Sequence, residues 1–595
     1  MKKPETQNWP KNIEAYSGLL LFAQSWEEML FDYTLDSYKP RRFNILGLCS
    51  ELIEAFDNLE SNNLRANSIT PIVEELLYVL DDDTISKNAL GTKCDLLKTQ
   101  IKQWNEEKPN KKVAYAASTI YEIIRPILKT KLSEELQKVV TDPRKPIEIS
   151  DFASRLLTEI LRQGYSPNHI YYSVQNFFFR NNPITSHEDL VTFLSFFNGI
   201  DHTYEVTFKM NKDCEVLARN FDDDYIKTSR KLEQRDKGNA YEKAFIESIK
   251  PSEVFVTMPK IETKDRYSAR REAEQRVDVA SLLTGFFNHK ICVDLNSDAL
   301  VVEENKKPYF IGQPVKPTMK RSDAPDNTIE QAMGELFKPI FSTQDPDLNT
   351  ISRLGSALRA HSIAIDAKII ENQFSSLWTA LETITTTAAT GNIIKSIISS
   401  AVPVLSLKYF LKLVVELRND IRKCIPLTWT SVCTKKQAGE SEIEFLVRLL
   451  SAEAAKPLRE ELYSACSNNP LLRHRISRFH DYTFRSLHTT RTVLNSHEKR
   501  ITWHLQRLYR ARNTLLHVGA AYETLDLLVE NLHDYFDHIM TEVAERLNPK
   551  SRHITIEQVF FEYDIEYKAY LKMLQESQTG LTRQEIAKLI VFGNL

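Results

Sequence analysis

The stretch that decides the fold lies near the C-terminus and reads Ser496-His-Glu-Lys-Arg-Ile-Thr-Trp-His-Leu-Gln-Arg-Leu-Tyr-Arg-Ala-Arg-Asn-Thr-Leu-Leu-His-Val-Gly519. Ser496 is a suitable N-cap, and Gly519 stands where helices commonly stop. Between them large apolar residues recur at helical spacing, which predicts one long amphipathic helix. The residues of this apolar stripe are Ile501, Leu505, Leu508, Leu515 and Leu516. Arg512 falls in the same stripe, where a guanidinium is costly unless it meets an anion or a carboxylate.

Length and composition place this helix in a large, mainly α-helical, multidomain protein. The chain has 595 residues, which predicts two to four domains, and only 15 glycines, which favours helix. No glycine-rich phosphate-binding loop is present. We expect a helical N-terminal region at 1–185 and an α+β region at 186–328 that ends in a proline-rich linker. A helical domain at 329–550 and a tail at 551–595, packed on that domain, complete the prediction.

The middle region changes from helical to alternating periodicity. A half-buried strand is predicted at 203–210, where Tyr204, Val206 and Phe208 alternate with polar residues. A helix is predicted at 265–287, whose stripe of small residues suits close packing on a sheet. Further short strands are predicted at 253–258, 290–295, 299–302 and 309–311, and one more in the tail at 554–561.

Cysteine spacing and the N-terminal sequence indicate the compartment. Seven scattered cysteines without a CxxC pair argue against disulfides and against a structural zinc site. The N-terminus lacks the apolar segment of a signal peptide, and the most apolar uncharged run, at 396–407, is too short to span a bilayer. We therefore expect a soluble cytoplasmic protein with no membrane association, no cofactor and no metal site.

Positive charge is concentrated around the long helix. Between Leu471 and Arg512 there are nine arginines and one lysine against one aspartate and one glutamate, in a chain whose net charge is −3. Aromatic residues are interleaved with the basic ones, as in a track that binds single-stranded RNA through phosphates and stacked bases. Solvated basic surface would give the same pattern. The candidate RNA-binding residues are Arg500, Arg507, Tyr509 and Arg510.

The end of the helix carries a recognisable pattern. Arg512-Asn513-Thr-Leu-Leu-His517, followed by Val518-Gly519, resembles the signature of HEPN domains in the Apea-like branch, which occurs in bacterial anti-phage and abortive-infection proteins. A second stretch, Phe374-Ser-Ser-Leu-Trp-Thr-Ala-Leu-Glu-Thr-Ile384, resembles an early helix of that branch, and Ala357-Leu-Arg-Ala-His361 precedes it. The resemblance covers roughly 345–550. It implies a helical HEPN bundle, a metal-independent endoribonuclease that cleaves RNA when triggered, and a homodimer formed through the HEPN domain. It also implies that the region before this domain, including the α+β region at 186–328, senses a trigger or holds the nuclease inactive.

The residue types suit that chemistry. The resemblance implies His517 as general acid or base, Arg512 as a clamp on the phosphate, Asn513 as an orienting group and Glu382 as a support for Arg512. At about 100° per residue, positions 512 and 517 lie about 140° apart on one helix. Two such helices facing each other across a dimer, or a distorted last turn, would make a better site than one regular helix alone.

Two alternatives remain open from the sequence. The chain could be a catalytically silent HEPN module that scaffolds a complex. It could also be a metal-dependent nuclease, because Asp294, Glu304 and Lys306 follow the Asp…Glu-x-Lys order of restriction-type nucleases. Lys307-Pro308 follow immediately and suggest a hairpin turn, which weakens the case for a nuclease core. A phage-derived trigger is the expected partner of the regulated nuclease.

Overall fold

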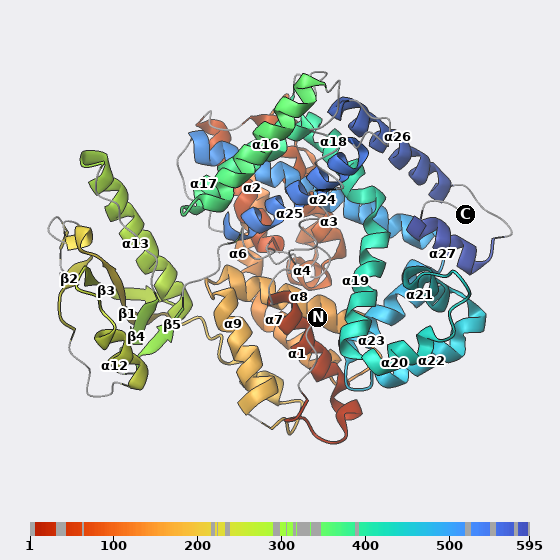
Figure 1. Cartoon of the computed structure of the whole chain (residues 1–595), viewed down its shortest axis with the longest axis horizontal. Coiled ribbons are helices and arrows are strands. Elements are labelled where there is room, and N and C mark those ends of the chain that lie inside the picture. Colours follow the sequence, from red (N-terminus) through yellow and green to blue (C-terminus); the bar gives the residue numbers. More distant parts are fainter. Residues whose placement is uncertain are drawn as a thin grey trace.

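The computed structural model shows a mainly helical protein with a small antiparallel sheet in its middle region (Figure 1). The residues described lie between Thr6 and Phe592, apart from the internal segments 31–42, 62–64, 182, 216–220, 223, 233–238, 290–297, 305, 313–316, 318–333, 335–346, 387–391, 518–524, 548–554 and 576–580. The side chain of His517 is also outside the described part.

The N-terminal helices surround one hydrophobic core. These helices are α1 (Ser17–Leu30), α2 (Ile45–Glu60), α3 (Thr70–Asp82), α4 (Thr84–Leu90), α5 (Lys93–Lys102), α6 (Lys112–Ile124), α7 (Leu128–Val139), α8 (Pro146–Arg162), α9 (Pro167–Val174) and α10 (Asp189–Leu194). Trp26, at the centre, is completely buried and donates from Nε1 to the carbonyl oxygen of Ala153, 2.9 Å away. The core continues to Phe197, so α10 belongs to it although it lies beyond the expected boundary at 185.

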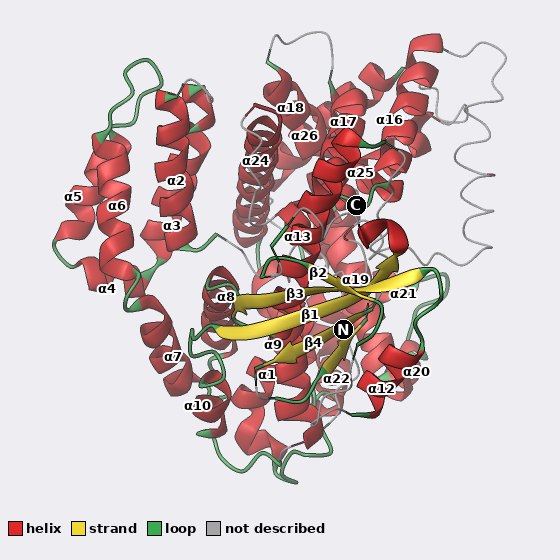
Figure 2. Cartoon of the chain, turned by 90° about the vertical axis from the view of Figure 1, so that its left-hand side faces the viewer, coloured by secondary structure: helices red, strands yellow, loops and turns green. Residues whose placement is uncertain are grey.

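The middle region is a five-stranded sheet in the order β2-β3-β1-β4-β5, in which every neighbouring pair is antiparallel. Its elements are β1 (His202–Asn211), β2 (Lys227–Ser229), α12 (Ala240–Glu247), β3 (Glu253–Thr263), α13 (Arg266–Phe287), β4 (Ala299–Glu303) and β5 (Tyr309–Ile311). Ala269, Ala273 and Val277 of α13 are buried against β1 and β3, as the small-residue stripe predicted. The sheet lies to one side of the helical body (Figures 1 and 2).

This sheet confirms four of the predicted strands, those at 203–210, 253–258, 299–302 and 309–311. The predicted strand at 290–295 lies outside the described residues.

The C-terminal helices form two cores instead of one. The first core contains α16 (Leu348–Asp366), α17 (Ile370–Thr385), α18 (Ile393–Leu407), α24 (Leu487–His517), α25 (Leu525–Leu547) and the first half of α26 (Ile556–Gln575). The second contains α19 (Tyr409–Cys424), α20 (Pro426–Cys433), α21 (Glu442–Ser451), α22 (Lys456–Ala465), α23 (Pro470–Arg478), the second half of α26 and α27 (Arg583–Phe592). The chain therefore leaves the first core after α18 and returns to it with α24.

Two sequence predictions about this part are wrong. Ser496 is inside α24, which begins at Leu487 after Ser486, whose hydroxyl accepts from the backbone N–H of Thr489 at 3.2 Å. The segment 554–561 is helical where described, since Ile556, Val559, Phe560 and Tyr563 are buried at helical spacing on α26. Because these residues complete the first core, the C-terminal segment is part of the bundle and not an outer tail.

No single described helix has the length and apolar character needed to cross a bilayer. By length and composition alone, α18 and α19 together are long and apolar enough, as a pair bent by 45°.

Candidate functional site

The long helix α24 places the candidate site between two parts of the molecule. Ile501, Leu505, Leu508 and Ala511 are buried in the first C-terminal core. The predicted apolar stripe is thus confirmed along most of its length, but Leu516 is 56% exposed. The opposite side of α24 faces α2 and α3 of the N-terminal region, through the contacts of Arg507 and Arg510.

The two stretches that carry the resemblance are neighbours in space. Trp378 of α17 is 1% exposed, and the centroid of its indole lies 5.8 Å from the ring centroid of Tyr509 on α24. Trp378 Nε1 donates to Glu382 Oε2 at 2.7 Å. The Leu-Trp run and the helix with the Arg–His pattern therefore pack together less than one helical turn before Arg512.

Arg512 and Asn513 lie near the end of α24 and are half-buried. Arg512 Nη1 donates to Asn513 Oδ1 at 3.1 Å, so the arginine and the proposed orienting group are in direct contact. The helix is regular up to His517, which keeps positions 512 and 517 about 140° apart around its axis. The His517 side chain falls outside the described part, so its predicted role stays a prediction.

The predicted support of Arg512 by Glu382 is not what the structure has. Within the described residues no ion pair joins these two side chains, and Glu382 instead accepts the indole N–H of Trp378 on its own helix. Residues 378 and 382 are one turn apart, so this local bond needs no approach of a second helix.

Two arginines of α24, Arg507 and Arg510, are buried against acidic side chains of the N-terminal region. Arg507 and Arg510 are 4% and 5% exposed. Both bind Glu51 of α2, with Nη2···Oε distances of 3.0 Å from Arg507 and 2.7 Å from Arg510. Arg507 Nη2 also lies 2.5 Å from Glu75 Oε2 of α3. The prediction that Arg507 and Arg510 contact RNA is therefore wrong for this conformation, because neither guanidinium is accessible to a phosphate.

Glu51 is held in its charged form by this network. Burial alone would raise the pKa of its carboxyl, but the charges and hydrogen bonds of Arg507 and Arg510 outweigh burial and lower the pKa to about 2. Two arginines and two carboxylates, Glu51 and Glu75, thus balance in charge at the contact between α24 and the N-terminal helices.

Other members of the basic stretch also have structural roles. Arg475 is buried and its Nη1 lies 2.7 Å from Asp420 Oδ2. His497 stacks on Tyr409 with ring centroids 3.7 Å apart, and burial lowers the pKa of His497 to about 3. His504 Nδ1 is 2.9 Å from the hydroxyl of Tyr535, and burial lowers the pKa of His504 to about 3 as well.

The two remaining RNA-binding candidates have different surroundings. Tyr509 is half-buried against Trp378, so one side of its ring is already covered. Arg500 is half-buried, and its role in RNA binding stays a prediction. Three arginines of the basic stretch, Arg475, Arg507 and Arg510, are therefore neutralised by carboxylates. Arg473, Arg478 and Arg485 are exposed, and RNA binding by the stretch stays a prediction.

The residues of the metal-nuclease alternative lie in and around a turn. Glu304 and Lys306 follow β4 and precede β5, as the Lys-Pro pair suggested. The ammonium of Lys306 pairs with Glu303, one residue before the candidate carboxylate. Asp294 lies outside the described residues. Glu304 and Lys306 are thus placed as turn residues commonly are, with the lysine already paired.

Glu51 is a residue that sequence reasoning missed. It lies within the apolar stripe of α2, between the buried Leu48 and Leu52. A carboxylate in such a stripe is as costly as the arginine noted at position 512, and it signals a buried cationic partner. The same argument that singled out Arg512 would have found Glu51.

The chain was compared with protein-family models, curated proteins and solved structures, and nothing matched in any of the three comparisons.

Proposed function

We propose that the chain is a regulated, metal-independent endoribonuclease of the HEPN type, acting in the cytoplasm in defence against phage. The observation that carries the proposal is the packing of Trp378 on Tyr509, which brings the Leu-Trp stretch of α17 beside the helix that ends in Arg512, Asn513 and His517. These two stretches are far apart in sequence, and a chance resemblance would not require them to meet.

In the proposed reaction, His517 removes the proton from the ribose 2′-hydroxyl. The 2′-oxygen then attacks the adjacent phosphorus, and the bond from phosphorus to the 5′-oxygen breaks. His517, which now carries that proton, acts as general acid and protonates the departing 5′-oxygen, which leaves a 5′-hydroxyl end and a 2′,3′-cyclic phosphate. Arg512 stabilises the charge that develops on the phosphate, and Asn513, which accepts a hydrogen bond from Arg512 at 3.1 Å, fixes the direction of the guanidinium.

A homodimer completes the proposed site. A regular helix separates positions 512 and 517 by about 140°, so one helix presents the two groups to different sides. Two antiparallel ends of α24 would place the arginine of one copy near the histidine of the other. The exposed Leu516, on the last turn, supplies apolar surface at that position.

Regulation follows from the contact that buries Arg507 and Arg510. Because Glu51 and Glu75 bind the helix just before Arg512, a shift of the N-terminal helices would move the candidate site. In this proposal a phage-derived trigger acts through the N-terminal or middle region, and the ion-paired contact transmits its effect to α24.

The function is tested by RNA cleavage in the presence of EDTA, with full-length protein purified from phage-infected and from uninfected cells. We expect the wild type from infected cells to cleave RNA, and a loss of about 10²–10³-fold in Arg512→Ala from the same cells, as is typical when one group that stabilises transition-state charge is removed. His517→Ala should be at least as impaired. Glu304→Ala is the matched control and should cleave normally, because its carboxylate lies in the turn after β4.

Contrary results of this experiment have distinct meanings. Full cleavage by His517→Ala would refute the proposed site. Loss of cleavage in EDTA together with loss in Glu304→Ala would support the metal-dependent alternative instead.

A silent HEPN interaction module is the second candidate function. It is favoured by one observation: Glu382 accepts a hydrogen bond from Trp378, and among the described residues no carboxylate pairs with Arg512 to orient it. Intact RNA under every growth condition that includes phage infection, with a folded and dimeric protein, would establish this candidate.

A further inference from the structure

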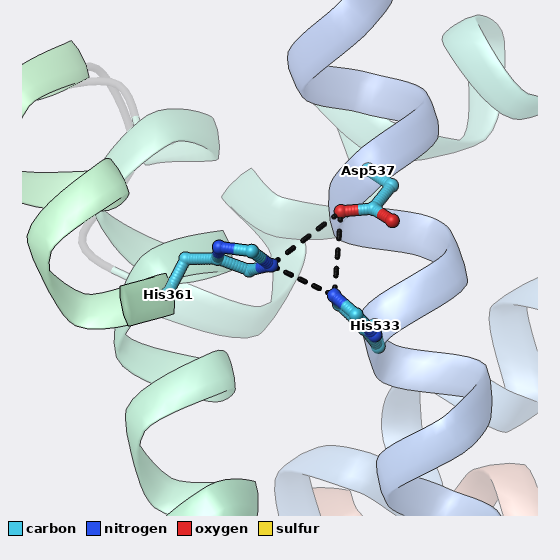
Figure 3. Close-up of side chains that lie close together, drawn as sticks. All are labelled: His361, His533 and Asp537. Carbon is cyan, nitrogen blue, oxygen red and sulfur yellow. Dashed lines mark hydrogen bonds and ion pairs between the residues drawn. The ribbon is translucent and has the colours of Figure 1, made fainter. Parts of the chain in front are cut away.

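Two histidines and one aspartate converge between α16 and α25. His361 projects from α16 toward His533 and Asp537, which lie one turn apart on α25 (Figure 3). The Nε2 atoms of the two histidines are 2.7 Å apart. Asp537 Oδ1 lies 3.7 Å from His361 Nε2 and 3.5 Å from His533 Nε2. Three ligand-type atoms therefore point at one small volume from two helices.

The triangle of these atoms has the size of one face of a metal coordination sphere. Ligands about 2.0–2.2 Å from a tetrahedral Zn²⁺ are separated from each other by about 3.3–3.6 Å. The two distances to Asp537 are 3.5 and 3.7 Å, close to this range. The pair of histidines at 2.7 Å would open by less than about 1 Å to admit the ion.

The two imidazoles also face each other through the atoms that would bind a metal, since Nε2 of His361 lies 2.7 Å from Nε2 of His533. A neutral imidazole offers a lone pair on Nε2, which is the form that binds a metal. Without a metal, one of the two facing Nε2 atoms must carry a proton and donate it to the other.

We propose that His361, His533 and Asp537 bind a divalent transition-metal ion of the Zn²⁺ type, which links α16 to α25. Two imidazoles and one carboxylate favour Zn²⁺, Co²⁺ or Ni²⁺ over Mg²⁺ and Ca²⁺, which prefer oxygen ligands. The side chains of His361 and Asp537 are 25% and 30% exposed, so water can reach the ion and fill its fourth position.

A bound ion would stabilise the first C-terminal core. His361 also stacks on Phe536 of α25, with ring centroids 5.2 Å apart, so the coordination would reinforce an existing contact between the two helices. This proposal does not rest on the proposed ribonuclease function. RNA cleavage in EDTA is measured well below the unfolding temperature of the metal-free chain, so that metal removal and loss of chemistry stay distinguishable.

The test is Zn²⁺ binding to the full chain, stripped with EDTA and dialysed, followed by calorimetry and by thermal unfolding. We expect one Zn²⁺ per chain and a rise in the unfolding temperature on adding Zn²⁺. Co²⁺ should give visible ligand-field absorption from a site of low coordination number. Asp537→Asn and His533→Gln should each weaken binding by more than about 100-fold, since changes even beyond the direct ligands cost about 10–100-fold.

The matched control is His488→Gln, which removes an exposed histidine of α24 away from the cluster. It should bind Zn²⁺ like the wild type. Circular dichroism of each variant verifies the helical content, and His361→Gln, at a half-exposed position, serves if His533→Gln fails to fold. Equal binding by all the variants, or no binding by the folded wild type, would overturn the proposal.

Discussion

Glu51→Gln is expected to lower the free energy of unfolding by about 3–5 kcal/mol, because it leaves two buried guanidinium groups without their shared carboxylate. Arg507 and Arg510 both bind Glu51, and all three side chains are less than one tenth exposed. Glu75 can still pair with Arg507, but among the described residues Arg510 would keep a single partner, the carbonyl oxygen of Ser68, 3.2 Å from its Nη1. Chemical denaturation followed by circular dichroism measures the loss.

Asp57→Asn is the matched control, since Asp57 is an exposed carboxylate on the same helix. It should change the free energy of unfolding by no more than about 0.5 kcal/mol. A loss of the same size in both variants would contradict the assigned role of Glu51.

The stability of the wild type should depend on pH through the same residue. The pKa of Glu51 in the folded chain, about 2, lies below its ordinary value of 4.5. The unfolded chain therefore takes up a proton first as the pH falls, so the stabilisation is complete above about pH 4.5 and is lost toward pH 2. In Glu51→Gln this component of the acid sensitivity should be absent.

Trp378→Ala is expected to cost about 3–5 kcal/mol of stability, as is usual for removing a large buried aromatic side chain. The indole is 1% exposed, packs near Tyr509 and lies in the first C-terminal core. Its loss would leave a cavity between α17 and α24 beside Arg512. RNA cleavage should fall with it, because the direction of the end of α24 depends on that packing.

Trp378→Phe distinguishes the contribution of the buried ring to stability from that of its hydrogen bond to Glu382. It retains most of the apolar contact and removes the donor to Glu382, so a smaller loss of about 1–2 kcal/mol is expected. Thr379→Ala, at the exposed neighbouring position, should be close to neutral. If Trp378→Ala were as stable as Thr379→Ala, the packing of α17 on α24 would be refuted.

The sequence predicted the elements whose periodicity is local. The alternation of Tyr204, Val206 and Phe208 predicted β1 correctly, and the small residues from Ala269 to Ala280 predicted the face of α13 that covers the sheet. The predicted apolar stripe of α24 is confirmed because Ile501, Leu505 and Leu508 are buried in one continuous core. The predicted first residue of this helix is wrong because Ser486 and Ser496 are both acceptable N-caps, and only packing decides between them.

The partners of the charged residues could not be predicted in the same way. The positive charge between Leu471 and Arg512 gave no indication of whether phosphates or carboxylates would neutralise it. The carboxylate that does so for Arg507 is 456 residues away in sequence. Pairing over that distance depends on how the N-terminal helices dock, which no local pattern encodes. His361 and His533, 172 residues apart, were not recognised as neighbours for the same reason.

Arg507 and Arg510 of α24 are paired inside the protein with carboxylates of the N-terminal helices. A double-mutant cycle between Glu51 and Arg510 tests this pairing most directly. The free energies of unfolding of wild type, Glu51→Gln, Arg510→Gln and the double variant are measured under the same conditions. We expect the double variant to lose about 2 kcal/mol less than the two single losses combined, because each single change leaves a buried charge unpaired. Single losses that add to within about 0.5 kcal/mol would show that the two side chains do not interact, and would contradict the claim.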